Sequence, residues 1–240
     1  MSAINDLARA DAAPVAVRHV CDACARAVRA SGVGLYVVGD LALGEPVYAT
    51  DPVSERVAEW QVTLGEGPAT RALVEARAVE APDLASGQAQ RDWPAFTPAA
   101  LAAGVCAVFA FPLLVGAITV GALEVYRVTS GGLSSTERAD ALLFADIAMG
   151  LILDRVHEIP TSAECELFAC EFGGRWVEVH QATGMVSVQL DTDLATAFLR
   201  LRVHAFLTNA RLSVVAHAVV ECRLRFTPDT TNDSGTEARE

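Results

Sequence analysis

The stretch 179–216 reads VHQATGMVSVQL and then DTDLATAFLRLRVHAFLTNARLSVVA, and it decides how we interpret the chain. Its apolar residues recur in steps of three and four, which is typical of amphipathic helices. The acidic break at 191–193 can end one helix and cap the next, because an aspartate side chain accepts hydrogen bonds from free backbone N–H groups. The pattern predicts a helix ending at residue 190, a second over 194–207 and a third over 212–226. By itself, such a segment is also compatible with a small dimerisation bundle.

The residues around this stretch indicate the domain boundaries. Helical periodicity begins at residue 166, although Gly173 and Gly174 interrupt it. Pro160 ends the preceding helix and predicts a short linker. Residues 227–240 contain almost no apolar side chain, which is typical of a disordered tail. We therefore predict an N-terminal domain over 1–158, a linker over 159–165, a three-helix domain over 166–226 and a tail over 227–240.

The N-terminal domain alternates helical and strand patterns. Apolar spacing predicts helices over 15–30, from 52 onward, over 69–75, 99–103 and 133–157. Runs rich in β-branched and aromatic residues predict strands over 34–38, 45–50, 77–81, 105–115 and 118–127. Residues 1–13 read as a loose start and 82–98 as an irregular crossover. This order predicts an α+β fold, in which helices flank an antiparallel sheet.

Two local motifs support these boundaries. The run GEGP at 65–68 places two glycines around an acid and then a proline, which predicts a tight turn that opens the helix at 69–75. Ser134 is followed three residues later by Glu137, which fits a capping box at the start of the long helix.

The chain is acidic, with a net charge of −12, which argues against a surface covered by nucleic-acid-binding side chains. The charge is uneven, because residues 1–165 hold 20 acidic residues and 11 arginines, whereas residues 166–226 hold six of each. The arginines of the second segment can therefore form a local basic patch. We see no signal-peptide pattern and no membrane-spanning apolar run, so we expect a cytoplasmic protein with reduced cysteines.

Several residues of the 179–216 stretch resemble the ANTAR family of RNA-binding transcription antiterminators. The run QATGM at 181–185 stands where the family has its first-helix signature, and Leu201, Arg202, Ala205, Asn209 and Leu212 match the second and third helices. The resemblance implies that this domain binds stem-loops in mRNA leader regions, commonly as a homodimer, and prevents a terminator hairpin from forming. The residues expected to bind RNA are Gln181, Thr183, Gly184, Arg200, Arg202, His204, Asn209 and Arg211.

One position departs from the family pattern. The family often has a lysine before the glycine, whereas this chain has Thr183 and contains no lysine at all. Phosphate contacts must then come from arginines, whose planar guanidinium pairs with phosphate or stacks on an unpaired base. Arg202 is the best candidate, while we expect Arg223 and Arg225 to be ordinary solvated charges.

The N-terminal domain resembles a GAF domain in its element order, in the GEGP turn and in the DWP crossover at 92–94. The resemblance implies a signal sensor with a small-molecule pocket between the sheet and its helices. Trp93, Phe96 and Phe109 could line such a pocket or fill it. The Asn-Lys-Phe-Asp-Glu set of cyclic-nucleotide-binding GAF domains is absent, so a cyclic nucleotide is not implied.

Signatures of catalysis are missing from the sequence, which has no P-loop, no GxSxG, no HExxH and no Rossmann glycine pattern. Cys21 and Cys24 form a CxxC pair on a predicted helix, but a zinc site needs about four ligands and no second pair follows. We expect core packing for both cysteines, no enzyme activity, no metal and no cofactor. Two alternatives stay open: a small-molecule or redox sensor whose C-terminal helices dimerise or bind a protein, and a GAF-like sulfoxide reductase that uses cysteines.

Overall fold

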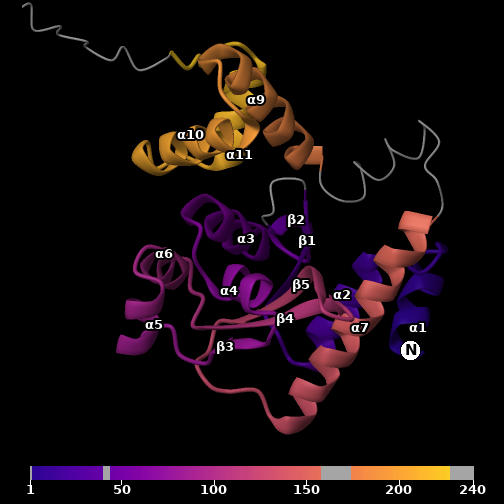
Figure 1. The fold of residues 1–240 in the computed structure, drawn as a ribbon. Coiled ribbons are helices and arrows are strands. Elements are labelled where there is room, and N and C mark those ends of the chain that lie inside the picture. Colours follow the sequence, from indigo (N-terminus) through magenta and orange to yellow (C-terminus); the bar gives the residue numbers. More distant parts are fainter. Residues whose placement is uncertain (1, 40–43, 158–173, 228–240) are drawn as a thin grey trace, which may run out of the picture. The chain divides into compact units, whose positions relative to one another are not determined.

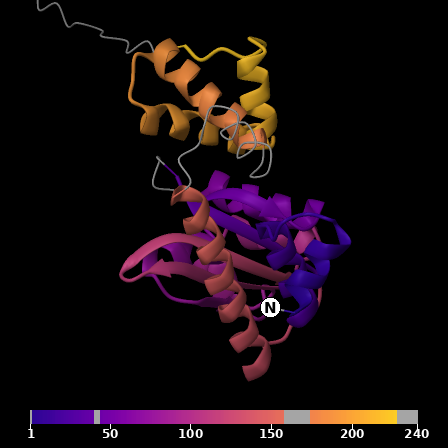
Figure 2. The same ribbon diagram turned by 90° about the vertical axis from the view of Figure 1, so that its right-hand side faces the viewer.

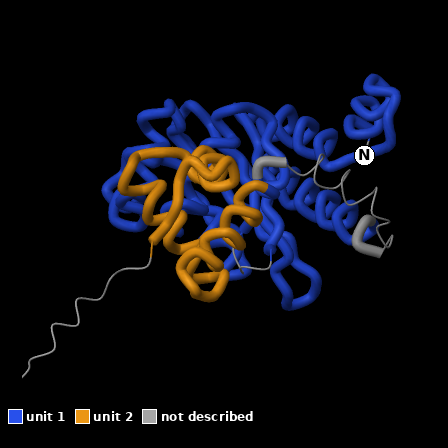
Figure 3. The backbone as a smooth tube through the Cα atoms, turned by 90° about the horizontal axis from the view of Figure 1, so that it is seen from above, with its two compact units in different colours: residues 1–177 blue, residues 178–240 orange. Residues whose placement is uncertain are grey.

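The computed structural model describes residues 2–39, 44–157 and 174–227. The chain forms two compact units, Met1–Val177 and Glu178–Glu240, which Figure 3 shows in blue and orange. The predicted linker at 159–165, the predicted helical turns at 166–173 and nearly all of the predicted tail lie outside the described residues. We refer to the two parts as unit 1 and unit 2 and describe each by itself.

A five-stranded antiparallel sheet forms the centre of unit 1 (Figure 1). Its strands are β1 (Gly32–Val38), β2 (Gly44–Ala49), β3 (Val79–Ala81), β4 (Ala107–Val115) and β5 (Ile118–Arg127). They lie in the order β2-β1-β5-β4-β3. Every pair is antiparallel, including β1 with β5, where Gly34 lies opposite Glu124. The antiparallel sheet and its flanking helices confirm the predicted α+β fold of this unit.

One face of the sheet is covered by α2 (Val17–Ala27) and α7 (Ser135–His157), and α1 (Ser2–Ala10) packs against α2. Figure 2 shows α7 lying over this face. The predicted loose start at 1–13 is wrong, since most of it is helix. Ile4 and Ala8 are four residues apart on α1, and both are buried in the packing of this face. This burial gives a short N-terminal helix the support that local propensity alone does not provide.

The other face is covered by α3 (Pro52–Leu64), α4 (Pro68–Glu75), α5 (Gly87–Asp92) and α6 (Phe96–Ala102). The sequence reading missed α5, which lies in the stretch taken as an irregular crossover. Ser86 caps this helix by accepting a hydrogen bond from the Ala89 backbone, and the Thr97 hydroxyl donates to the Ala89 carbonyl oxygen at 3.0 Å. Contacts from the neighbouring helix therefore stabilise a helix too short to show periodicity.

Side-chain caps are present at the start of two helices of unit 1. Ser134 and Glu137 form the predicted capping box, in which each side chain accepts a hydrogen bond from the other's backbone N–H, at 3.2 and 2.8 Å. Asp51 caps α3 by accepting hydrogen bonds from the backbones of Val53 and Ser54, at 2.8 and 3.1 Å. Each cap satisfies backbone donors that the helix itself leaves free.

Unit 2 contains α10 (Leu194–Leu207), α11 (Leu212–Val220) and most of α9 (Gly174–Leu190), whose first residues fall in unit 1. Asp193 caps α10 as predicted, by accepting a hydrogen bond from the backbone of Thr196 at 2.9 Å. The buried apolar residues of this unit come from all three helices: Val179, Ala182, Val186, Ala197, Phe198, Leu201, Ala205, Leu212, Val215, Ala216 and Val219.

The last helix is shorter than the predicted 212–226. It ends at Val220 because Cys222 adopts a left-handed conformation with φ 56°, and the Arg223 N–H turns back to the Ala218 carbonyl oxygen at 2.8 Å. This is the hydrogen bond of a Schellman-type C-cap. The chain then continues without helical structure as far as Thr227.

Within the described residues, none of the individual helices is long and apolar enough to cross a membrane. Only α10 and α11 taken together pass on length and composition, and they meet at a bend of 117°.

Candidate functional site

The GEGP run connects α3 to α4 and, through Glu66, also contacts the start of α6. Gly65 ends α3 in the left-handed conformation with φ 73°, and Pro68 is the first residue of α4, as the sequence predicts. Between them, Gly67 has φ 138°, which side chains rarely adopt. We call residues 65–68 the 65–68 turn.

Glu66 connects the 65–68 turn to α6. One carboxylate oxygen of Glu66 accepts hydrogen bonds from the backbone N–H groups of Ala95 and Phe96, at 2.6 and 2.7 Å. The residue at the cap position of α6 is Ala95, whose side chain has no acceptor. Glu66 therefore supplies, from about 30 residues earlier in the chain, the N-terminal cap that α6 lacks.

A buried polar cluster lies next to the 65–68 turn. The Gln61 amide donates to the Tyr36 hydroxyl at 3.0 Å and to Glu124 Oε2 at 2.5 Å, and its oxygen accepts from the Ala69 backbone at 2.7 Å. The Tyr36 hydroxyl donates to Glu124 Oε1 at 2.8 Å. A Cβ at Gly67 would overlap the Gln61 side chain. We call Tyr36, Gln61 and Glu124 the buried acid cluster.

Glu124 is the ionisable centre of this cluster. It is 3% exposed, and its side-chain partners are neutral groups, the hydroxyl of Tyr36 and the amide of Gln61. Burial raises the pKa of Glu124 to about 7, against the opposing effect of these hydrogen bonds. Burial also raises the pKa of Tyr36, so its hydroxyl stays protonated and remains a donor. The cluster can therefore gain or lose one proton near neutral pH.

The three aromatic residues expected to line a ligand pocket do not come together. Trp93 and Phe96 belong to the core between the sheet and α3 to α6, whereas Phe109 belongs to the core on the opposite face. All three are almost completely buried, and the Arg71 guanidinium lies 4.7 Å from the centre of the Trp93 ring. In this structure they fill the two cores instead of sharing one cavity.

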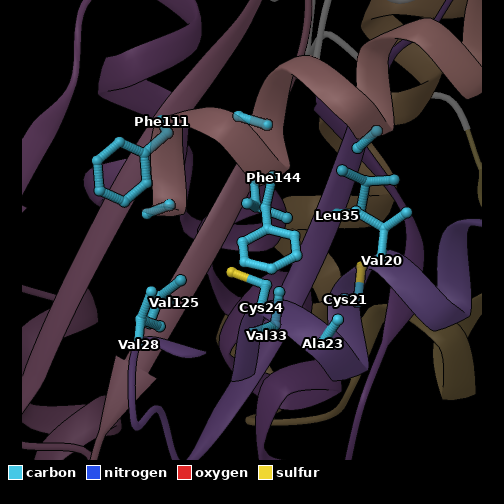
Figure 4. Close-up of a cluster of buried hydrophobic side chains, with 14 of the residues drawn as sticks. Val20, Cys21, Ala23, Cys24, Val28, Val33, Leu35, Phe111, Val125 and Phe144 are labelled. Carbon is cyan, nitrogen blue, oxygen red and sulfur yellow. The ribbon is translucent and has the colours of Figure 1, made fainter. Parts of the chain in front are cut away.

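The CxxC pair lies in the core beneath α7. Figure 4 shows Cys21 and Cys24 among apolar side chains, with Cys24 beside Phe144. Burial raises the pKa of both thiols, that of Cys24 to about 12, which opposes the thiolate that a redox or nucleophilic role requires. Among the described residues, no group of three or more histidines, cysteines and carboxylates could hold a metal ion. Cys165 and Cys170 lie outside the described residues.

The predicted first-helix signature of unit 2 is only partly exposed. Thr183 is buried, and its hydroxyl donates to the Val179 carbonyl oxygen at 2.7 Å, so its side chain is not exposed for contact with RNA in this structure. Its hydroxyl bonds to its own helix, which allows a small polar residue inside the bundle. Gln181 is exposed on α9. A Cβ added at Gly184 would meet nothing within 4 Å, so no close backbone approach explains this glycine.

The remaining predicted RNA-binding residues lie on α10 and on the turn after it. Arg200 is exposed, whereas Arg202 is half-buried with its guanidinium 5.9 Å from the Phe198 ring centre, and burial lowers its pKa. His204 packs edge-on against Phe226, with ring centres 5.4 Å apart.

Asn209 and Arg211 lie in the turn between α10 and α11. Asn209 is exposed in the left-handed conformation with φ 50°, and Arg211 is the N-cap residue of α11. The structure therefore brings these two residues close to the C-terminal end of α10, near the last turn that carries His204. Gln181 and Gly184, by contrast, lie on a different helix.

Two features of unit 2 were not predicted from the sequence. The first is that α10 exposes large apolar residues on its outer face, namely Leu199, Val203, Phe206 and Leu207. The second is that Arg223 and Arg225 follow the C-cap on a segment held in place, since the Phe226 N–H donates to the Gln189 side chain at 2.8 Å. The exposed apolar residues could have been found from a helical projection of 194–207, which places apolar side chains on both sides of the predicted helix.

The charge of unit 2 differs from that of the chain as a whole. The described segment 174–227 has six arginines and four acidic residues, in a chain with a net charge of −12. Helices α10 and α11 contain two arginines and two histidines but no acidic residue. In the described part of unit 2, the acidic residues are instead at Glu178, which pairs with His217 at 3.3 Å, at the cap before α10 and at the ends of α9 and α11.

No protein-family model and no curated protein matches this chain. Solved structures with a similar arrangement include the GAF domain of an Acinetobacter phosphoenolpyruvate-protein phosphotransferase, at 11% identity over 67% of this chain and 96% of that chain, with a TM-score of 0.48. The corresponding GAF domain from Coxiella burnetii has 13% identity over 65% and 94%, with a TM-score of 0.48. A type II free methionine-R-sulfoxide reductase from Thermoplasma acidophilum has 14% identity over 63% and 96%, with a TM-score of 0.42. At these identities the likeness says nothing about a ligand or a reaction.

Proposed function

We propose that this chain is a signal-responsive regulator of transcription that binds RNA stem-loops through unit 2, an ANTAR-like domain, under the control of unit 1, a GAF-like sensor. The observation that carries the proposal is the distribution of charge. In a strongly acidic chain, α10 and α11 carry arginine and histidine and no acidic residue. A surface of this kind attracts a polyanion, while the acidic unit 1 does not.

The side chains of α10 suit RNA loops in particular. Arginine can pair with phosphate through two parallel hydrogen bonds or stack on an unpaired base. The deep groove of duplex RNA excludes side chains, whereas a loop presents its bases to them. In the proposed mechanism, binding holds a stem-loop of nascent mRNA in a form that prevents the terminator hairpin, so that transcription continues. We expect a homodimer in the cytoplasm, with each unit 2 taking one of two tandem stem-loops.

Unit 1 is proposed to act as the sensor and not as an enzyme. Support comes from the GEGP motif, from the antiparallel sheet between two layers of helices and from the buried acid cluster beside the 65–68 turn. This turn contacts α3, α4 and α6, so a signal that alters the cluster would be felt by three helices at once. The signal could be a small molecule taken up between these helices and the sheet.

The proposal is tested by fluorescence anisotropy of the full chain with an RNA that carries two tandem stem-loops, at several salt concentrations. We expect salt-dependent binding that weakens in Arg200→Ala and in Arg202→Ala. Each lost phosphate contact should also reduce the slope of log affinity against log salt by about 1. The matched control is Arg138→Ala in unit 1, where the arginine pairs with Glu80 at the surface, and this variant should bind like wild type. No binding by a folded chain at low salt would contradict the proposal.

One observation supports a second candidate, a protein partner for unit 2. The outer face of α10 is apolar, and protein interfaces often use such patches. A chain that binds no RNA but changes its mass in light scattering when Leu199 or Val203 is replaced by serine would favour this second function.

A further inference from the structure

Helix α10 exposes several large apolar side chains on its outer face, where polar side chains are usual for a surface helix. Leu199 is 52% exposed, Val203 43%, Phe206 58% and Leu207 75%. The spacing of four and three places the first three residues on one side of the helix. Four large apolar side chains in nine residues form a continuous patch and not scattered surface residues. We call Leu199, Val203, Phe206 and Leu207 the α10 outer face.

This face is not needed to complete the core of unit 2. The opposite side of α10 already carries Ala197, Phe198, Leu201 and Ala205, all of which are buried against the other helices. Within the described residues, the bundle is therefore closed without the outer face. The exposed residues favour a role in binding something outside unit 2.

The charge around this face distinguishes between two possible partners, a second copy of α10 and RNA. The α10 outer face lies between Arg200 on one side and Arg202 on the other, and the helix has no acidic residue. A second copy of α10 packed on this face would bring like charges together, which is unfavourable in an interface of low dielectric. RNA has the opposite composition, with negative phosphates outside and flat apolar bases inside. The patch and its borders therefore match a nucleic acid better than a second copy.

Phe206 is the residue of this face with an aromatic ring. It lies one helical turn after Arg202 and three residues before Asn209, the exposed residue that ends α10 in the left-handed conformation. Aromatic rings of nucleic-acid-binding proteins stack on unpaired bases, and neighbouring arginines hold the backbone. Asn209 carries both a donor and an acceptor that can reach the edge of a stacked base.

We propose that Phe206 is the stacking platform for an unpaired loop base of the RNA, with Arg202 directed to the adjacent phosphate and Asn209 to the edge of the base. This inference rests on the proposed function of unit 2 and adds the residue that recognises the loop. It also explains why a surface helix keeps its phenylalanine exposed.

The test compares Phe206→Ala, Phe206→Leu and Phe206→Trp in the full chain, by anisotropy with a stem-loop RNA. Removing the ring should weaken binding by about 10- to 100-fold, since stacking on an aromatic side chain contributes about that much per base. Phe206→Leu keeps the apolar volume without the ring and should lose most of the affinity as well. Phe206→Trp should bind like wild type, and its added fluorescence should be quenched by RNA. The matched control is Val188→Ala, which removes an exposed apolar side chain of α9, outside the α10 outer face, and should change affinity less than about two-fold.

Salt separates stacking from simple charge attraction. The slope of log affinity against log salt should be unchanged in Phe206→Ala, whereas Arg200→Ala reduces it, because stacking releases no counterions. An RNA with an abasic loop should bind wild type and Phe206→Ala equally.

Several results would overturn the inference in different ways. Equal affinity of wild type and Phe206→Ala, while Arg200→Ala remains weakened, would show that the domain binds RNA without this platform. A dimer in light scattering that dissociates in Phe206→Ala would assign the face to a protein contact. A wild-type chain that binds no RNA at all would remove the proposed function together with this inference.

Discussion

Gly67 in unit 1 is closely packed by neighbouring atoms, whereas Gly184 in unit 2 has open space where a side chain would be. At Gly67 a Cβ would overlap the Gln61 side chain, which is held by Tyr36 and Glu124. At Gly184 a Cβ would meet nothing within 4 Å. The first glycine is required by the packing of its own domain, whereas nothing within the described structure requires the second.

The same contrast extends to the two units. Unit 1 encloses polar groups, with a carboxyl, a phenol and an amide buried together beneath α3 and α4. Unit 2 does the reverse and exposes large apolar residues on the outer face of α10. Departures from ordinary burial inside a fold affect its stability and its protonation, whereas departures at the surface indicate a partner. Under the proposed function, this difference would place the response of unit 1 in its interior and the binding role of unit 2 on its surface.

The largest effect should come from Gly67→Ala. The new methyl group must displace Gln61 from the buried acid cluster, and φ 138° is strained for alanine, so the free energy of unfolding should fall by about 3 kcal/mol. Urea denaturation of the full chain measures this loss. The matched control is Gly104→Ala, where φ is also positive but nothing lies within 4 Å, and where strain alone should cost about 1 kcal/mol. Equal losses in the two variants would contradict the role of Gln61.

An effect of about the same size is expected from pH. Burial raises the pKa of Glu124 from 4.5 to about 7, so between these pH values the unfolded chain has released a proton that the folded chain still holds. Its contribution to the free energy of unfolding should therefore fall by about 3 kcal/mol as the pH rises across this window. Glu124→Gln keeps the shape and does not titrate, so it should gain about this much relative to wild type between pH 5 and pH 8 in urea denaturation. Carboxylates with lowered pKa values, such as Asp51, act in the opposite direction but cancel in this comparison. If the free energies of unfolding of wild type and Glu124→Gln changed equally with pH, Glu124 would not be the group that titrates in this window.

Glu66→Ala should have an intermediate effect. It removes the acceptor of two backbone N–H groups at the start of α6 and should lower the free energy of unfolding by about 2 kcal/mol. Glu66→Gln retains a neutral acceptor and should recover part of this loss. Both are measured by urea denaturation, and RNA affinity at a temperature where the chain is folded should not change. A loss in Glu66→Gln as large as in Glu66→Ala would point to charge, and not hydrogen bonding, as the cause.

The smallest effect should come from Gly184→Ala in unit 2. Alanine is favoured over glycine within a helix, and nothing opposes the new Cβ, so the helix should be stabilised by up to about 1 kcal/mol. Thermal unfolding followed by circular dichroism measures this gain, and anisotropy measures RNA binding in the same variant. Unchanged affinity would make the glycine unnecessary for the RNA. A loss of affinity in the stabilised variant would instead indicate that the RNA backbone approaches α9 closely, as the family resemblance implies.

Much of the fold follows from local sequence signals. Asp193 and the box of Ser134 and Glu137 mark helix starts because their side chains bond to backbone groups within three residues. The strands β4 and β5 follow from long runs of apolar and β-branched residues. The helix α5 does not, because it has six residues and depends on Thr97 from the next helix.

The sites were less predictable than the fold, since they depend on contacts between distant residues. The buried acid cluster joins Gln61 to Glu124, 63 residues apart, and nothing near Glu124 in the sequence marks it as buried beside a tyrosine. Thr183 was expected to bind RNA because of its position in the family motif, but its side chain is buried and its hydroxyl bonds within the helix. The end of α11 was placed too late because the left-handed Cys222 is not glycine, the residue that usually signals such a cap.

The two hydrogen bonds from Glu66 to the backbones of Ala95 and Phe96 also make these two amides natural reporters. Their N–H groups can exchange with solvent deuterium only when the Glu66 carboxylate moves away, because a bonded amide must open before it exchanges. Their exchange rates therefore follow the opening of the 65–68 turn, separately from global unfolding. A signal that acts through unit 1 would be visible there as a change in protection, before any change in RNA binding is measured.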